Sequence, residues 1–365
     1  MKKFFLGVFA IAGLVACVQT EEVDIPNLAD NQIAFGGYVG NSVRTAVDPS
    51  TTVGGLNHFT VWAYVGDSQG EVFNSTLVSK DGNNAWTYDD ARYWMDGHDY
   101  RFFAITPYGK GVSHVEVVNN PMKAEHDPFN NGLGQINFTN ENGTEDVLYA
   151  SSNESTKISV PEKVTFNFNH LLSKIKFTFT NGFPSPYNTL EVTNICMQVP
   201  SKGSVDLTQT TRPYLWDVVT TNNDITLSFG NAINKLDATK GVSLGSSESG
   251  ECEFECLTLP IQNGTTLVPH LNVTFDVVLY QGDQVAIAKS NRLAKLVLDG
   301  SLTGLEKGIE QGKAYRINAT LNSENITDDK LLEIKFDDVK VDEWITAENP
   351  EVVYDAGAIN TQPAQ

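Results

Sequence analysis

The sequence predicts an all-β protein built from β-sandwiches, and three observations support this. Apolar and polar residues alternate over short runs rich in Val, Ile, Thr and aromatic residues, which is typical of half-buried strands. Clusters of Gly, Asn, Asp and Pro separate these runs, as turns between strands require. Stretches with helical periodicity are almost absent. Many short strands joined by polar turns indicate a sandwich, and a chain of 365 residues has room for two sandwiches in series.

The expected strands are spread along the whole chain. The first is residues 32–39, where Ile33, Phe35 and Val39 share one face. The clearest later runs are 59–65, 100–105, 164–168, 175–180, 225–229, 271–280 and 332–336. A polar stretch at 151–156 marks the divide between domains. We therefore expect an N-terminal sandwich at 31–163, a C-terminal sandwich at 164–350, and a flexible tail or donor segment at 351–365.

The first sixteen residues have the organisation of an export signal. Lys2 and Lys3 precede an apolar run at 4–12, which is too short to span a bilayer permanently. Residues 14–17 read Leu-Val-Ala-Cys, which is a lipobox: its cysteine thiol takes a diacylglyceryl group before the signal is cleaved. The sequence thus predicts a signal peptide at 1–16, lipidation at Cys17 and a tether at 17–30. The alternative is an ordinary secretory peptide with a chance cysteine.

Charge and cysteine content narrow the function classes. The net charge is −20, which argues against nucleic acid as a partner, because the phosphates would be repelled.

A lipidated Cys17 leaves Cys196, Cys252 and Cys256. The alternation at 252–256 predicts that Cys252, Phe254 and Cys256 share one strand face, too far apart along the strand for a Cys252–Cys256 disulfide. Small buried apolar side chains are the favoured interpretation, with a bridge from Cys196 as the alternative.

Catalytic and metal-binding motifs are not found. The six histidines are scattered without metal-ligand spacing, and His170 is expected to be a hydrogen-bonded core residue because it shares a face with Phe166 and Phe168. Paired carboxylates are expected by chance in so acidic a chain, and no nucleophile elbow is present. We therefore expect no catalytic residues, no metal site and no cofactor. The tryptophans are expected to pack in the core, with stacking on glycans as the alternative.

Four patches, in this order behind a lipobox, resemble the fimbrillin-like family of Bacteroidetes surface lipoproteins. The patches are residues 93–107, 166–177, 312–318 and 334–344. The resemblance implies two transthyretin-like β-sandwich domains. It also implies pilus subunits that assemble when a protease removes the first strand and the next subunit supplies a replacement strand.

The residues allow such processing at one place near the first strand. Arg44 is the only basic residue between Lys3 and Lys80, and it lies in a polar, turn-like stretch after residues 32–39. Cleavage there would make Thr45 the new N-terminus. The open groove would then bind an alternating strand, which satisfies both its backbone groups and its apolar surface. The plain alternative is that Arg44 is a solvated loop residue.

Taken together, the sequence predicts a structural or adhesive subunit of a cell-surface pilus, anchored to the outer membrane by lipid. The expected partners are other pilin subunits in a homo- or hetero-polymer, and a host protein or glycan. The alternative is a non-polymerising surface lipoprotein that binds glycans or host proteins. The two hypotheses differ in whether the first strand can be exchanged.

Overall fold

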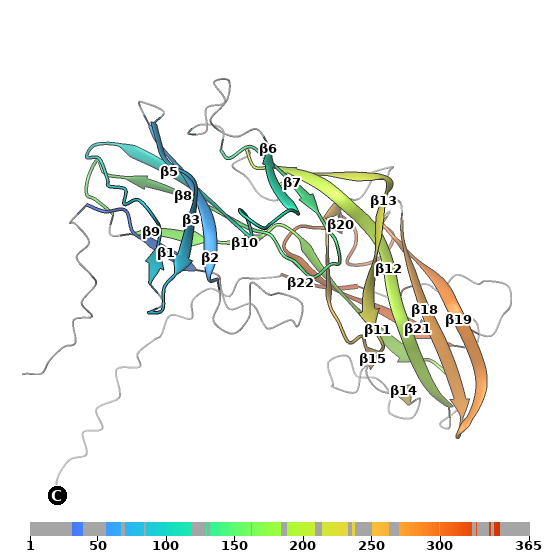
Figure 1. Cartoon of the computed structure of the whole chain (residues 1–365). Helices are drawn as coiled ribbons and strands as arrows, with labels where there is room; N and C mark the ends of the chain where they lie inside the picture. The colour runs from blue at the N-terminus through green and yellow to red at the C-terminus, as the bar shows by residue number, and fades with distance from the viewer. Residues whose placement is uncertain are drawn as a thin grey trace, which may run out of the picture.

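The computed structural model describes most of the chain between residues 31 and 343. The described residues are 31–38, 56–66, 70–83, 85–118, 129, 132–161, 163–183, 188–208, 214–232, 236–237, 250–262, 270–298, 300–322, 326, 336 and 339–343. Their backbone forms strands β1 to β22 joined by turns, which confirms the all-β prediction (Figure 1). In this part of the chain no helix is both long and apolar enough to cross a membrane.

The N-terminal part is built around a six-stranded sheet with strand order β10-β8-β5-β2-β3-β4. Its strands are β2 (His58–Val65), β3 (Gly70–Lys80), β4 (Trp86–Thr87), β5 (Asp99–Thr106), β8 (Leu148–Ser155) and β10 (Asn169–His170). A two-stranded sheet of β1 (Phe35–Tyr38) and β9 (Val164–Asn167) packs against it. The apolar cluster between the two sheets, here the N-terminal core, includes Ile33, Phe35, Phe59, Val61, Phe73, Phe102, Val164, Phe166 and Phe168.

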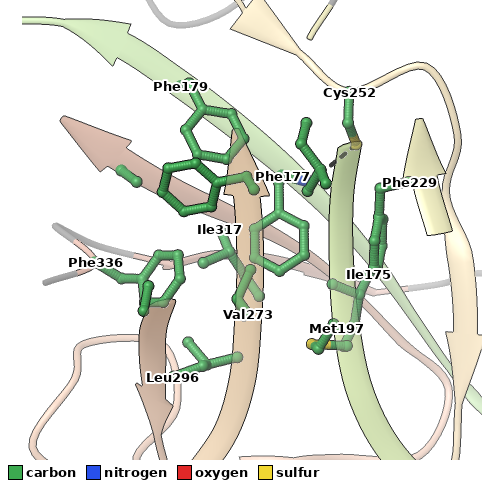
Figure 2. Packing of buried hydrophobic residues seen from close by; sticks show 14 of the residues in the cluster. Ile175, Phe177, Phe179, Met197, Phe229, Cys252, Val273, Leu296, Ile317 and Phe336 are labelled. Atoms are coloured by element: carbon green, nitrogen blue, oxygen red, sulfur yellow. Dashed lines mark hydrogen bonds between the residues drawn. The ribbon is translucent and has the colours of Figure 1, made fainter. Parts of the chain in front are cut away.

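The C-terminal part contains a five-stranded sheet and a seven-stranded sheet. One has the order β15-β11-β21-β22, with β16 also paired to β11. Its strands are β11 (Ser173–Asn181), β15 (Gly250–Glu251), β16 (Cys256–Thr258), β21 (Lys313–Leu321) and β22 (Val339–Glu343). Aromatic and aliphatic side chains fill the space between the two sheets; Figure 2 shows Phe177, Phe229, Val273, Ile317 and Phe336 among them.

The other large sheet has the order β19-β18-β12-β7-β6, with β13 and β14 also paired to β12. Its strands are β6 (Val115–Val118), β7 (Gln135–Thr139), β12 (Asn188–Asp206), β13 (Trp216–Gly230), β14 (Leu236–Asp237), β18 (His270–Gln281) and β19 (Gln284–Val297). A short pair, β17 (Ile261–Gln262) and β20 (Gly308–Ile309), lies apart from these sheets in the pairing. Strands β6 and β7 come from the first half of the chain, so the two halves share this sheet.

A third apolar cluster, here the junction core, joins the two parts. Trp62, Tyr64 and Phe103 project from the second face of the six-stranded sheet. They pack with residues of later elements, including Val205, Leu207, Tyr214, Leu257 and Leu259. Strand β2 is therefore buried on both faces, which explains why seven of its eight residues are buried rather than every second one.

The strand at 164–170 belongs to the N-terminal part and not to the C-terminal sandwich. We predicted that residue 164 opens the second domain. In the structure β9 pairs with β1, β10 pairs with β8, and Phe166 and Phe168 lie in the N-terminal core. The first strand of the C-terminal sheets is β11, which begins at Ser173. The polar stretch at 151–156 lies before the predicted boundary, but it is not a linker. Most of it belongs to strand β8, whose exposed side chains are polar.

His170 lies at this junction as a buried, hydrogen-bonded residue. Its Nδ1 contacts the Asp146 carboxylate, and both side chains are almost fully buried. Its carbonyl oxygen accepts a hydrogen bond from Gln311 Nε2 at 3.1 Å. The prediction of a core histidine is therefore confirmed.

The alternation expected at 252–256 is wrong. Cys252 and Cys256 are buried, but Phe254 is 47% exposed, because the chain leaves the sheet between β15 and β16. The Cys252 thiol accepts a hydrogen bond from Phe177 N at 3.3 Å (Figure 2) and donates one to Phe254 O at 3.0 Å. All three described cysteines are free thiols, so the bridge from Cys196 is not formed. Burial raises the pKa of Cys252 and that of Cys256 to about 12.

Candidate functional site

The candidate site is the place in the N-terminal part where residues 31–38 lie. Strand β1 runs parallel to β9, with Phe35 opposite Val164 and Tyr38 opposite Asn167. Val164 N donates a hydrogen bond to Ala34 O at 2.8 Å. Within the described part of the chain, β9 is the only strand that pairs with β1. The first strand is therefore an edge element held on one side by a backbone ladder.

The start of this segment is held by residues 88–94, here called the latch. Ile33 N donates to Arg92 O at 2.8 Å, and Trp94 N donates to Asn31 O at 2.9 Å. These bonds surround an isolated bridge between Gln32 and Tyr93. The latch thus satisfies backbone groups of residues 31–33 before the ladder to β9 begins.

Tyr88 adds a side-chain hydrogen bond to the latch. Its hydroxyl donates to Ile33 O at 2.6 Å and accepts from Arg92 N at 3.4 Å. Burial raises the pKa of Tyr88, so the hydroxyl keeps its proton and remains a donor at neutral pH. Arg92 fixes the latch to β3, because its Nε donates to Val72 O at 3.1 Å.

Phe35 supplies most of the apolar contact between the first strand and the sheet. It is 6% exposed, and Ile33 beside it is fully buried. Five aromatic rings surround it, here called the aromatic slot. Their centroids lie 5.8 Å (Phe59), 5.3 Å (Phe73), 5.5 Å (Tyr88), 6.2 Å (Phe102) and 6.0 Å (Phe166) from the ring of Phe35. The rings come from β2, β3, β5, β9 and the latch, so the slot exists only in the folded domain.

This arrangement holds an extended strand against an apolar slot. Without residues 31–38, the slot would expose five rings and the backbone groups along one side of β9. Such a surface favours an extended segment with alternating apolar side chains. Among the described residues, no group of three or more His, Cys, Asp or Glu side chains could hold a metal ion.

Two of the predicted site residues meet here. Ile33 and Phe35 both lie in the N-terminal core, as the alternation of residues 32–39 predicted. Val39, Arg44, Thr45 and Cys17 lie outside the described residues. Trp62 and Trp94 are buried, which confirms packing for these two residues.

Sequence reasoning missed the latch. Tyr88 and Arg92 belong to no periodic run, and their partners Ile33 and Val72 are 55 and 20 residues away in the chain. The only feature near them that the sequence singled out is Trp94, which belongs to the patch at 93–107 that resembles the family.

The sequence matches the fimbrillin-like family over residues 45–344. This chain belongs to the fimbrillin-like family. The first strand, residues 31–38, therefore lies before the matched region. A search of curated proteins finds no match.

One of the solved structures similar to this fimbrillin-like chain shares its fold. A fimbrial protein from Bacteroides vulgatus has a TM-score of 0.60 at 14% identity, covering 86% of this chain and all of that one. A proposed cell adhesion protein from Parabacteroides distasonis has a TM-score of 0.48 at 12% identity, covering 86% and 96% of the two chains. Another, from Bacteroides uniformis, has a TM-score of 0.43 at 14% identity, covering 87% and 100%.

Proposed function

We propose that this protein is a structural or adhesive subunit of a cell-surface fimbrium that assembles by donor-strand exchange after cleavage at Arg44. The single observation that carries the proposal is the first strand: it pairs with β9 alone and inserts Phe35 into the aromatic slot. Membership of the fimbrillin-like family supports it. The fimbrial protein from Bacteroides vulgatus, which has the same fold, gives further support.

The physical argument concerns what holds the first strand. Before cleavage, the strand is covalently linked to the rest of the domain, so it cannot leave the molecule. After a cut between Arg44 and Thr45 this link is lost, and the contacts that hold the strand among the described residues are the ladder to β9, the latch and the slot contacts. A strand from another subunit that repeats these contacts can then replace it, since the slot offers the same hydrogen bonds and rings to either strand.

The experiment is cleavage of the purified precursor with an arginine-specific protease, followed by electrophoresis without boiling. We expect a ladder of high-mass species and a new N-terminus at Thr45. The Arg44→Ala variant should keep its first strand and give no ladder of high-mass species under the same treatment.

A folded, soluble monomer after complete cleavage at Arg44 would overturn the proposal. That result would favour the second function, a non-polymerising surface lipoprotein that binds glycans or host proteins. Cleavage at other arginines is separated from this outcome by sequencing the N-terminus of each fragment.

The membrane attachment belongs to the same proposal. The lipobox before Cys17 supports export to the outer membrane with a lipid anchor and display on the cell surface. Mass spectrometry of the mature N-terminus in cells tests it: we expect acylated Cys17 in the uncut form. The Cys17→Ala variant should lose both the lipid and the membrane fraction.

A further inference from the structure

The seven-stranded sheet has two long outer strands, β19 and β13. Residues Cys196 and Met197 of β12 pair with Thr274 and Val273 of β18, and they also pair with Ser228 and Leu227 of β13. Strands β18 and β13 therefore lie on opposite sides of β12. Strand β19 lies beyond β18, on the outer side of the sheet (Figure 1). In the described part of the chain, β19 pairs only with β18, and β13 pairs only with β12.

These two edges carry opposite charge. The fourteen residues of β19 include Lys289, Arg292 and Lys295 and no acidic residue. Arg292 is buried, so the half-buried Lys289 and the exposed Lys295 supply the accessible charge. The fifteen residues of β13 include Asp217 and Asp224 and no basic residue. In a chain with 45 acidic and 25 basic residues, three basic residues without an acidic one make β19 an unusual strand.

Strand β19 also exposes apolar side chains. Val285 is 58% exposed and Leu293 is 41% exposed. Leu293 and Lys295 project from the same face of the strand, because their positions differ by two residues. A long edge strand with exposed apolar residues is a template for pairing with another strand, and natural sheets usually shorten or cover such an edge.

The edge of β13 is open over part of its length. At its end, Phe254 N donates to Phe229 O at 3.1 Å, and the Cys256 thiol donates to Ser228 O at 3.3 Å. The segment before Ser228 has no such cover from described residues. Asp217 and Asp224 are both exposed there, on either side of the register shift between Pro200 and Lys202 of β12.

We propose that β19 of one copy of this chain pairs with β13 of a second copy, so that the seven-stranded sheet continues from molecule to molecule. Two different edges form this contact, so it is heterologous and can repeat without closing. Pairing of β19 with another β19 would oppose like charges, and so would pairing of β13 with β13. The contact is independent of the aromatic slot, which lies in the N-terminal part, and it needs no cleavage at Arg44.

The test uses the full mature chain with Arg44→Ala, so that the first strand stays in place and strand exchange cannot contribute. Sedimentation velocity over a concentration series up to about 1 mM, the weak end of specific affinity, should show growing species without a fixed size. A β19 variant carries Leu293→Glu and Lys295→Glu, and a β13 variant carries Asp217→Lys and Asp224→Lys. Lys289 and Arg292 are left unchanged because they make other interactions in the chain.

Each variant alone should be monomeric. In the β19 variant, the exposed positions 293 and 295 become acidic and oppose the acidic Asp217 and Asp224 of β13. In the β13 variant, the substituted positions become basic and oppose the basic residues of β19. An equal mixture should associate again, because each edge of one variant then faces an opposite charge on the other. All four substituted residues are exposed, so circular dichroism and thermal melting should match those of the parent.

Four results would overturn the proposal. A parent chain that stays monomeric up to about 1 mM has no such contact. Association that survives in both variants uses another surface. Loss of association in the β19 variant alone indicates pairing between like edges, and two inactive variants that do not recover on mixing exclude the charge-matched contact.

Discussion

At the scale of single residues, Phe35 links the first strand to the five rings of the aromatic slot. The Phe35→Ala substitution in the uncut protein should lower the free energy of unfolding by about 3–5 kcal/mol, because it removes a buried ring from the aromatic slot. Urea denaturation measures this. Leu77→Ala, at a 54% exposed position on β3, is the matched control and should change stability by less than about 0.5 kcal/mol. Equal effects would mean that Phe35 does not lie in the slot in solution.

Two consecutive carboxylates allow a second residue-scale test. Asp146 contacts His170 with both side chains buried, whereas Glu145 is 49% exposed and contacts His114 at 2.7 Å. Asp146→Ala should cost about 1–3 kcal/mol, because it leaves the buried Nδ1 of His170 without its hydrogen-bond partner. Glu145→Ala should cost less than about 1 kcal/mol, because half of the Glu145 side chain is exposed and water screens its contact with His114. The free energies of unfolding of both variants decide this, and equal values would contradict the burial of the Asp146–His170 pair.

The buried thiols predict chemical reactivity. Desolvation raises the pKa of Cys252 and that of Cys256 from 9.0 to about 12, so both remain protonated and unreactive at neutral pH. In the chain without Cys17, a thiol reagent at pH 8 should modify the half-buried Cys196 first. The other two should react only after unfolding. Mass spectrometry after cleavage at glutamate residues separates the three sites, because Glu253 and Glu255 lie between Cys252 and Cys256.

The raised pKa of the two buried thiols makes the stability of the folded protein depend on pH. The folded protein holds the thiol protons up to about pH 12, while the unfolded chain releases them near pH 9. The free energy of unfolding should therefore fall as the pH rises from 9 towards 12. Rapid modification of Cys252 in the folded protein would contradict the burial of this thiol.

At the scale of elements, the attachment of β22 depends on the turn before β20. Gly304 has φ +88°, and a Cβ at this position would lie 2.1 Å from the main-chain oxygen of Val339, the first residue of β22. Gly304→Ala should therefore displace β22 and strongly destabilise the C-terminal sheet. The control is Gly282→Ala in the β18–β19 turn, where φ is +62° and the Cβ would meet no atom within 4 Å.

The control variant isolates backbone strain from steric conflict. Gly282→Ala should cost only about 1 kcal/mol, the usual cost of a left-handed conformation for a residue with a Cβ. Hydrogen exchange of the β21 and β22 amides reports whether the strand pair separates in Gly304→Ala. Unchanged protection of these amides would show that the turn can move without β22.

At the scale of the whole molecule, the junction core predicts cooperative unfolding. Trp62 and Phe103 of the six-stranded sheet pack with Val205 and Leu259 of later elements, and β6 and β7 complete a sheet of the C-terminal part. Neither part can unfold without exposing this shared apolar surface. Calorimetry should show a single transition whose calorimetric and van't Hoff enthalpies agree. Two separate transitions would mean that the junction core does not couple the parts.

The sequence determined the fold class and the face of the first strand. Alternation places residues on opposite sides of a strand by local geometry alone, so Ile33, Phe35, Phe166 and Phe168 could be assigned to a core from their spacing. The turns between short strands could also be predicted from local sequence, because clusters of Gly, Asn, Asp and Pro mark them. Alternation and turns depend only on residues that are adjacent in the chain, so they can be predicted from the sequence.

Only the tertiary structure decided which core each strand joins. It placed 164–170 with the N-terminal sheet, brought Tyr88 and Arg92 to Ile33, and turned Phe254 away from Cys252 and Cys256. These outcomes depend on strands that are far apart in the sequence, and an alternating pattern shows that one face is buried without showing its partner. The tertiary structure also decided that β13 and β19 lie at opposite edges of one sheet, because the order of strands is set by pairing between distant parts of the chain.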